Sequence, residues 1–147
     1  MRPEASSFEE IEHTADWAIR VRGATLPDLF ANAARAMYSL VVDLGALPLT
    51  ETRTVEVEGV SVEGMLVKWL NELLYITEMD HLAFSRFHIE ALDAPGDPPE
   101  GPIGRLLARV EGGPARELRK YIKAATYHGL SVRRDTDGYS AEIVFDV

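Results

Sequence analysis

Two groups of side chains, one near each end of the chain, are of types that could carry chemistry. The first consists of His13 and Asp16, in a segment rich in ionisable groups between two extended runs. Residues three apart lie on opposite faces of a continuous strand, but a tight turn can bring them together and display Asp16 at a sheet edge. The same segment could instead form a simple turn in which the Asp16 carboxylate only accepts hydrogen bonds from backbone amides.

The second group closes the sequence. Asp146 follows an apolar run and Val147 adds a free carboxylate, so several hard oxygen atoms lie within one residue of each other. Such oxygens suit a divalent cation such as calcium, manganese or magnesium. If this strand runs beside the one that follows Asp16, three carboxylates converge, and their repulsion requires a cation or bound protons. Without that proximity, Asp146 is an ordinary solvated chain end.

A third candidate region is the segment Lys-Ala-Ala-Thr-Tyr-His over residues 123–128. As a strand, it would place Thr126 and His128 on one face and Lys123 and Tyr127 on the other. His128 could bind a metal, carry a proton or contact a partner, although a lone histidine at a strand end is commonly structural. No serine or cysteine nucleophile is evident beside it.

The hydrophobic pattern predicts the elements that position these residues. Apolar residues spaced by three and four predict one helix after the cap Thr25, ending near residues 43–45, and a second after the cap Ser61. The Met and Trp on the second stripe are interpreted as core residues. Strands are expected over residues 8–13, 17–22, 52–58, 84–92, 103–110, 118–128, 130–134 and 139–147. Short connections, including a proline-rich loop over 93–102, predict antiparallel neighbours. The expected fold is therefore α+β, with two helices packed on a mostly antiparallel sheet, in a single domain over residues 1–147.

Composition narrows the classes of function. The 147 residues include 24 acidic and 15 basic side chains, for a net charge of −9, so direct tight binding of nucleic acid is disfavoured. A basic protein partner or a divalent cation suits this charge better. The absence of cysteine excludes disulfides, a thiolate nucleophile and a cysteine-type zinc site. No apolar run has the length of a signal peptide core or a membrane span, so we expect a cytoplasmic protein that does not enter a membrane.

Four motifs, in order along nearly the whole chain, resemble the archease family. They are His13-Thr14-Ala15-Asp16, Asn71-Glu72-Leu73-Leu74-Tyr75, Lys123-Ala124-Ala125-Thr126-Tyr127-His128 and Phe145-Asp146-Val147. The resemblance implies a small α+β protein that is not itself an enzyme. Members assist the GTP-dependent, manganese-using RNA ligase of tRNA splicing and RNA repair, by promoting guanylylation of the ligase histidine and supporting multiple turnovers.

The resemblance also implies a divalent-cation site, described as calcium in the family, which maps to Asp16, Asp146 and Val147. In one respect the sequence departs from the family pattern. An acidic residue commonly precedes the lysine of the third motif by two positions, and here that position is Tyr121. Lys123 therefore lacks a familiar ion-pair partner, and its family role is open, whereas the cation site does not depend on it.

Three hypotheses follow. In the leading one, the chain activates the ligase, with the cation site at one tip and a neighbouring contact surface shaped by His13, Lys123, Thr126 and His128. In the second, it is a chaperone-like modulator of a tRNA methyltransferase, a role that the resemblance also implies. The third is a metal-dependent hydrolase that uses the same carboxylates with His128, but the sequence contains no obvious base, oxyanion donor or substrate pocket.

Overall fold

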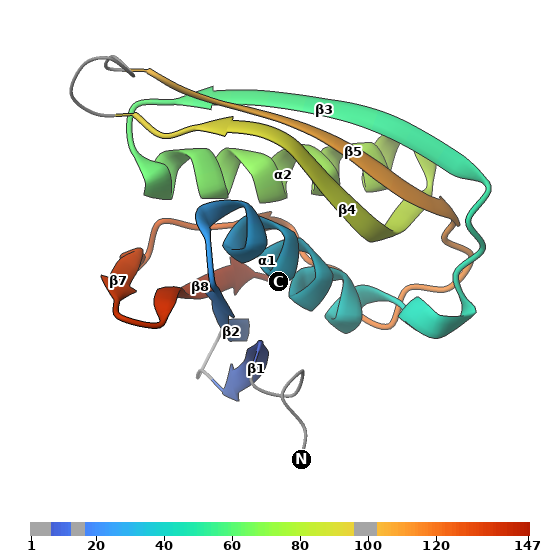
Figure 1. The fold of residues 1–147 in the computed structure, drawn as a ribbon. Coiled ribbons are helices and arrows are strands. Elements are labelled where there is room, and N and C mark those ends of the chain that lie inside the picture. Colours follow the sequence, from blue (N-terminus) through green and yellow to red (C-terminus); the bar gives the residue numbers. More distant parts are fainter. Residues whose placement is uncertain (1–6, 13–16, 96–102) are drawn as a thin grey trace.

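The computed structural model describes residues 7–12, 17–95 and 103–147, and within them the chain forms two antiparallel sheets and two α-helices (Figure 1). The first sheet has the order β1 (Phe8–Glu12), β2 (Trp17–Gly23), β8 (Gly138–Asp146) and β6 (Ala124–Ala125), and β7 (Arg133–Asp135) also pairs with β8. The second has the order β3 (Glu51–Gly59), β5 (Gly104–Pro114) and β4 (Leu82–Asp93). The helices are α1 (Leu26–Val41) and α2 (Val62–Asp80), and a short 3-10 turn, η2, spans Leu44–Ala46. The α+β expectation is confirmed.

Both helices begin where the sequence predicts. The Thr25 hydroxyl accepts a hydrogen bond from the Asp28 backbone N–H at 3.2 Å, and the Ser61 hydroxyl accepts one from the Gly64 N–H at 2.9 Å. Each cap satisfies an N–H group that has no partner within its helix. Helix α2 ends at Asp80, and the left-handed backbone of the next residue, His81 (φ 59°), stops the helical repeat.

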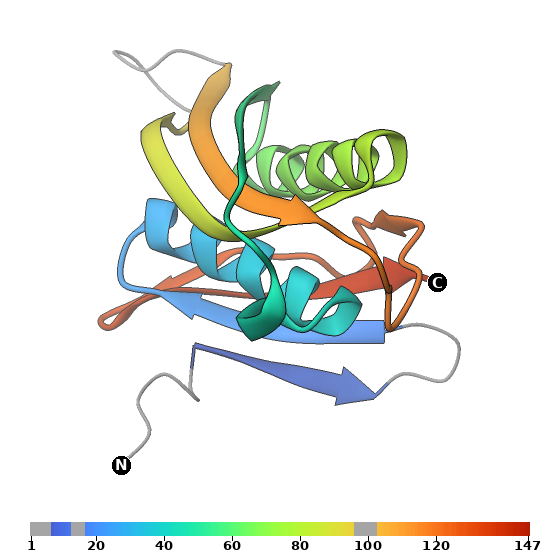
Figure 2. The ribbon, with the colours of Figure 1, turned by 90° about the vertical axis from the view of Figure 1, so that its right-hand side faces the viewer.

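The helices form a layer between the two sheets (Figures 1 and 2). Helix α1 contacts β2 of one sheet and β4 of the other, and α2 contacts β3 and β6. Two buried side chains link the helices: the Trp69 indole N–H donates to the Phe30 carbonyl at 2.9 Å, and the Tyr38 hydroxyl donates to the Leu73 carbonyl at 3.0 Å. Burial raises the pKa of Tyr38 well above its ordinary value. The Met65 and Trp69 stripe is core, as expected.

The predicted strand over residues 118–128 is wrong, because only Ala124–Ala125 pair as a strand. Before them, the Arg119 N–H donates to the Val41 carbonyl at the end of α1, at 2.6 Å, and Ile122 is buried. Slightly earlier, the Ala115 N–H donates to the carbonyl of His81, the residue that caps α2, at 2.9 Å. Contacts with two helix ends therefore replace a strand ladder. The loop over 93–102 does join antiparallel strands, since Asp93 pairs with Arg105; its residues 96–102 lie outside the described part.

A large bulge follows β6. Ala125 pairs with Phe145 and Arg133 with Ser140, so seven residues (126–132) on one side face four (141–144) on the other. The three extra residues push the segment out of the sheet, and Gly129, with φ 63°, turns the chain. The predicted strand over 130–134 is therefore shorter and shifted, to Arg133–Asp135.

No helix in the described part is long and apolar enough to cross a membrane.

Candidate functional site

The pairing of β8 with both β2 and β6 builds one end of the first sheet around Asp146. Trp17, at the start of β2, pairs with Phe145, and Ala124 of β6 pairs with Asp146. The Lys123 backbone N–H donates to the Asp146 carbonyl at 2.8 Å, which extends the pairing by one bond. We call this end, formed by Asp146, Val147 and the strand ends beside them, the carboxylate tip.

The sequence prediction placed Asp16 and His13 in the same site. Both lie outside the described residues, although Asp16 precedes Trp17 directly in the chain. The described part of the structure contains no group of three metal-ligating side chains. The expected convergence of Asp16, Asp146 and Val147 thus stays a prediction, and what the structure contributes is the pairing of Trp17 with Phe145.

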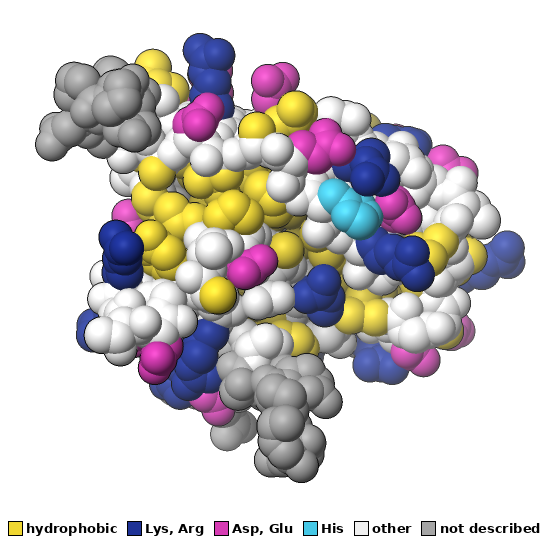
Figure 3. Space-filling view, viewed as in Figure 1, with side chains coloured by type: hydrophobic (Ala, Val, Ile, Leu, Met, Phe, Trp, Pro, Cys, Tyr) yellow, Lys and Arg dark blue, Asp and Glu magenta, His cyan; other side chains and the backbone are white. Residues whose placement is uncertain are grey.

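The carboxylates of the tip are open to solvent and take part in no ion pair among the described residues. Asp146 is exposed, Val147 is 40% exposed, and none of the ion pairs in residues 7–12, 17–95 and 103–147 involves either of them. Elsewhere, acidic and basic side chains are interspersed, as the face in Figure 3 shows, so the net charge alone marks no site. An exposed, unpaired carboxylate such as that of Asp146 is a ligand type that a hard divalent cation takes.

Thr126 holds the start of the bulge against β8. Its backbone N–H and its hydroxyl both donate to the Val144 carbonyl, at 3.0 and 2.9 Å. The His128 N–H donates to the Thr126 hydroxyl at 3.3 Å, which leaves the imidazole of His128 exposed on the bulge. The prediction that His128 and Thr126 share one face of a continuous strand is therefore wrong, because the strand ends at Ala125 and the chain turns.

Asn71 positions β6, a role that the sequence reasoning missed. Its side-chain oxygen accepts a hydrogen bond from the Ala125 N–H at 2.7 Å, and its side-chain nitrogen donates to the Ala125 carbonyl at 3.2 Å. The carboxamide thus pairs with the edge strand as a neighbouring peptide group would. The one sign of this role in the sequence is that Asn71 is a polar residue beside the apolar stripe of α2. Through this pair, α2 holds Lys123 next to Asp146 and Thr126 next to Val144.

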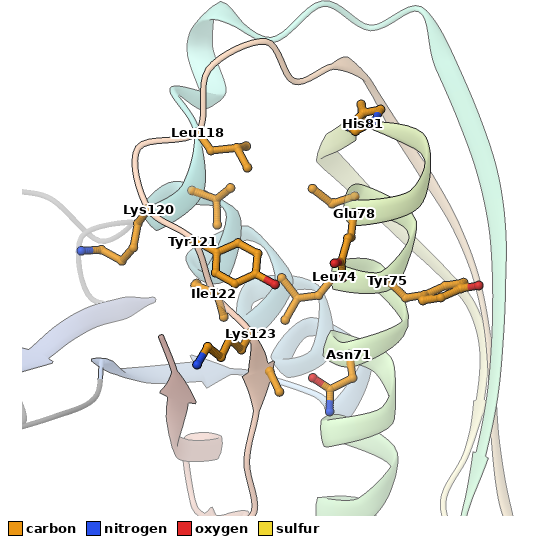
Figure 4. A pocket seen from close by; sticks show the side chains of 13 residues that line it. Asn71, Leu74, Tyr75, Glu78, His81, Leu118, Lys120, Tyr121, Ile122 and Lys123 are labelled. Atoms are coloured by element: carbon orange, nitrogen blue, oxygen red, sulfur yellow. The ribbon is translucent and has the colours of Figure 1, made fainter.

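A lysine lies against the tip from the other side. The Lys120 ammonium is 2.9 Å from the centroid of the Trp17 ring, a cation–π contact. Lys123 lines a hollow between α2 and residues 118–124, which Figure 4 shows from close by. The structure therefore brings Lys123, Thr126 and Asp146 together through backbone pairing, with His128 following on the bulge.

Residues 8–147 match the sequence model of the Archease protein family (MTH1598/TM1083). The chain is 32% identical to a protein archease of Methanosarcina acetivorans over the full length of both, and 38% identical to one of Methanopyrus kandleri over 95% of this chain and 99% of the relative. The solution structure of Methanobacterium thermoautotrophicum protein 1598 aligns with a TM-score of 0.81 at 26% identity, covering 97% of this chain and 99% of that one.

A crystal structure of a Thermotoga maritima archease, described as a possible chaperone, aligns with a TM-score of 0.60 at 25% identity, covering 95% of this chain and 96% of that one. The family model extends through the last residues of the chain, and the fold comparison covers 97% of it. The chain belongs to the archease family.

Proposed function

We propose that this protein is a non-enzymatic cofactor that activates a GTP- and manganese-dependent RNA ligase of tRNA splicing and RNA repair. It would promote guanylylation of the ligase and sustain its turnover. Family membership supports this role. The observation that carries it is the tip itself: strand pairing presents Asp146 and Val147 at one exposed end, with no basic side chain of the described residues paired to them.

The cation would be held by the carboxylates of Asp16, Asp146 and Val147. Calcium accepts six to eight oxygen ligands in flexible geometry, which suits carboxylates on neighbouring strand ends; manganese or magnesium could take the same oxygens. A bound cation would neutralise the repulsion between these groups. The resulting tip could dock at a basic, metal-using active site, where complementary charge speeds the encounter and fixes orientation.

The neighbouring residues would shape the contact surface. The Lys123 backbone is bonded to Asp146 and its side chain is exposed, and the imidazole of His128 is exposed and available to a partner. Thr126 would act through position, because its hydroxyl is already bonded to Val144. His13 would complete this surface and lies outside the described residues.

The decisive experiment is single-turnover guanylylation of the cognate ligase with and without this protein. We expect the wild type to accelerate the reaction and Asp146→Ala to lose the acceleration while remaining folded. Asp137→Ala is the matched control, because this exposed aspartate lies in the turn before the opposite end of β8. Full stimulation by both Asp146→Ala and Asp16→Ala would refute the mechanism.

A second candidate is a chaperone-like modulator of a tRNA methyltransferase. It is favoured by the structural relative from Thermotoga maritima that is described as a possible chaperone. Suppression of aggregation of unrelated proteins, together with copurification with a methyltransferase in place of a ligase, would support this role. No effect on aggregation and no such partner would exclude it.

A further inference from the structure

The hollow beside α2 has the character of a docking groove. It has a volume of about 400 Å³ and lies between α2 and residues 118–124. Figure 4 shows Leu118 and Tyr121 pointing across it toward Leu74 and Glu78 of α2. Leu118 and Tyr121 are 47% and 55% exposed, so their apolar surface is not used by the core. Exposed tyrosine and leucine around an apolar hollow are typical of a surface that a partner covers.

The charge of this segment is opposite to that of the chain. Residues 115–123 contain four basic side chains and one acidic, a net charge of +3, whereas the whole chain carries −9. Lys120 and Lys123 take part in none of the ion pairs within the described residues. An incoming carboxylate would therefore find both ammonium groups free of internal acidic partners.

The groove is continuous with the carboxylate tip. The Lys123 backbone bonds to Asp146 at 2.8 Å, and Lys120 lies on the ring of Trp17, which pairs with Phe145. A protein that receives the tip must therefore also lie over, or very near, the groove. A basic patch beside an acidic one permits a single orientation of the partner, because the reverse orientation would face like charges.

We infer that this groove is the docking site of the partner ligase, and that it receives an acidic segment of the ligase carrying a large apolar side chain. The inference rests on the proposed function, since it takes the same ligase as the partner. The apolar side chain would fill the space between Leu74, Leu118 and Tyr121, and acidic residues would pair with Lys120 and Lys123. The tip acts on the reaction, and the groove holds the partner in place.

The test measures the affinity of the cognate ligase for two groove variants, each with a matched control. Tyr121→Ala is compared with Tyr127→Ala, because Tyr127 is similarly exposed (59%) and lines a separate hollow on α2. Lys120→Glu is compared with Arg133→Glu, an exposed cation of β7 with the same change in charge. We expect each groove variant to weaken binding about tenfold or more, as for a residue at the centre of an interface. The controls should bind as the wild type does.

The same samples are assayed for guanylylation at saturating protein. Groove variants should raise the half-saturating concentration and keep the maximal rate, whereas Asp146→Ala should lower the maximal rate. Equal affinities of all variants, or no binding by the wild type, would overturn the inference. Binding by the wild type that depends on the groove but brings no stimulation would refute only the proposed function. A labelled RNA oligonucleotide is tested in the same way. If it binds the wild type and not Lys120→Glu, while Lys120→Glu keeps its affinity for the ligase, the groove is an RNA-binding surface and the inference is overturned.

Discussion

Replacing Asn71 by alanine tests how the tip is held. The change removes both hydrogen bonds to Ala125, at 2.7 and 3.2 Å. A neutral hydrogen bond contributes about 1 kcal/mol, so the pair contributes about 2 kcal/mol. Alanine regains roughly 0.5 kcal/mol of helix propensity within α2. We therefore expect the free energy of unfolding to fall by about 1.5 kcal/mol, measured by urea denaturation.

Hydrogen exchange gives the local readout. The Ala125 amide should exchange about tenfold faster in Asn71→Ala, because β6 has only two paired residues and loses its hold on α2. Stimulation of the ligase should fall as well, since Lys123 and Thr126 lose their fixed positions beside Asp146. Asn32→Ala is the control: Asn32 is also half-buried on a helix, and its side chain donates to the Arg22 carbonyl at 2.7 Å. If both variants lose the same stability and Ala125 exchange stays unchanged, Asn71 does not position β6.

Three further predictions concern single residues. Burial raises the pKa of Tyr38, so the unfolded chain loses this proton first, and the free energy of unfolding should fall by about 1.4 kcal/mol per pH unit above roughly pH 10. Urea denaturation at several pH values should show that Tyr38→Phe lacks this part of the pH dependence. The same pH dependence in both proteins would contradict the prediction. Gly129 has φ 63° with open space around it, so Gly129→Ala should cost about 1 kcal/mol in urea denaturation and Gly129→Asn less; equal costs would mean that the left-handed backbone is not required. Calorimetric titration should show calcium binding to the wild type and to Asp137→Ala but not to Asp146→Ala. If Asp146→Ala still binds calcium, Asp146 is not a ligand of the cation.

The sequence predicts the helices well because their signals are local. Thr25 and Ser61 are caps that precede apolar stripes of period 3.6, and both the caps and the stripes are found in the structure. The core assignment of Trp69 follows from the same stripe. Strand pairing is different in kind. Trp17 and Phe145 are distant in the chain, and composition and periodicity hold no information on their register.

The two failures near the site have physical causes. Residues 118–128 alternate well enough to resemble a strand, but Ile122 is buried in the hydrophobic core and the ladder is only two residues long. In the sequence, Asn71 looks like a polar helix residue that faces solvent. Its role depends on hydrogen bonds to an edge strand that is distant in the chain. A polar group that pairs with a distant backbone is invisible in local sequence.

Strand pairing places Asp146, and helix α2 holds the segment that follows β6. It holds the segment that contains the bulge at two points: the Asn71 carboxamide binds Ala125 at one end, and the Glu63 carboxylate accepts a hydrogen bond from the Val132 N–H at 2.9 Å at the other. Between these points, β8 supplies only the Thr126 bonds within the described residues. Since the Trp69 indole also binds α2 to α1, this segment is anchored to the helical core. A short edge strand can therefore carry exposed polar groups at defined positions without a long ladder beneath them.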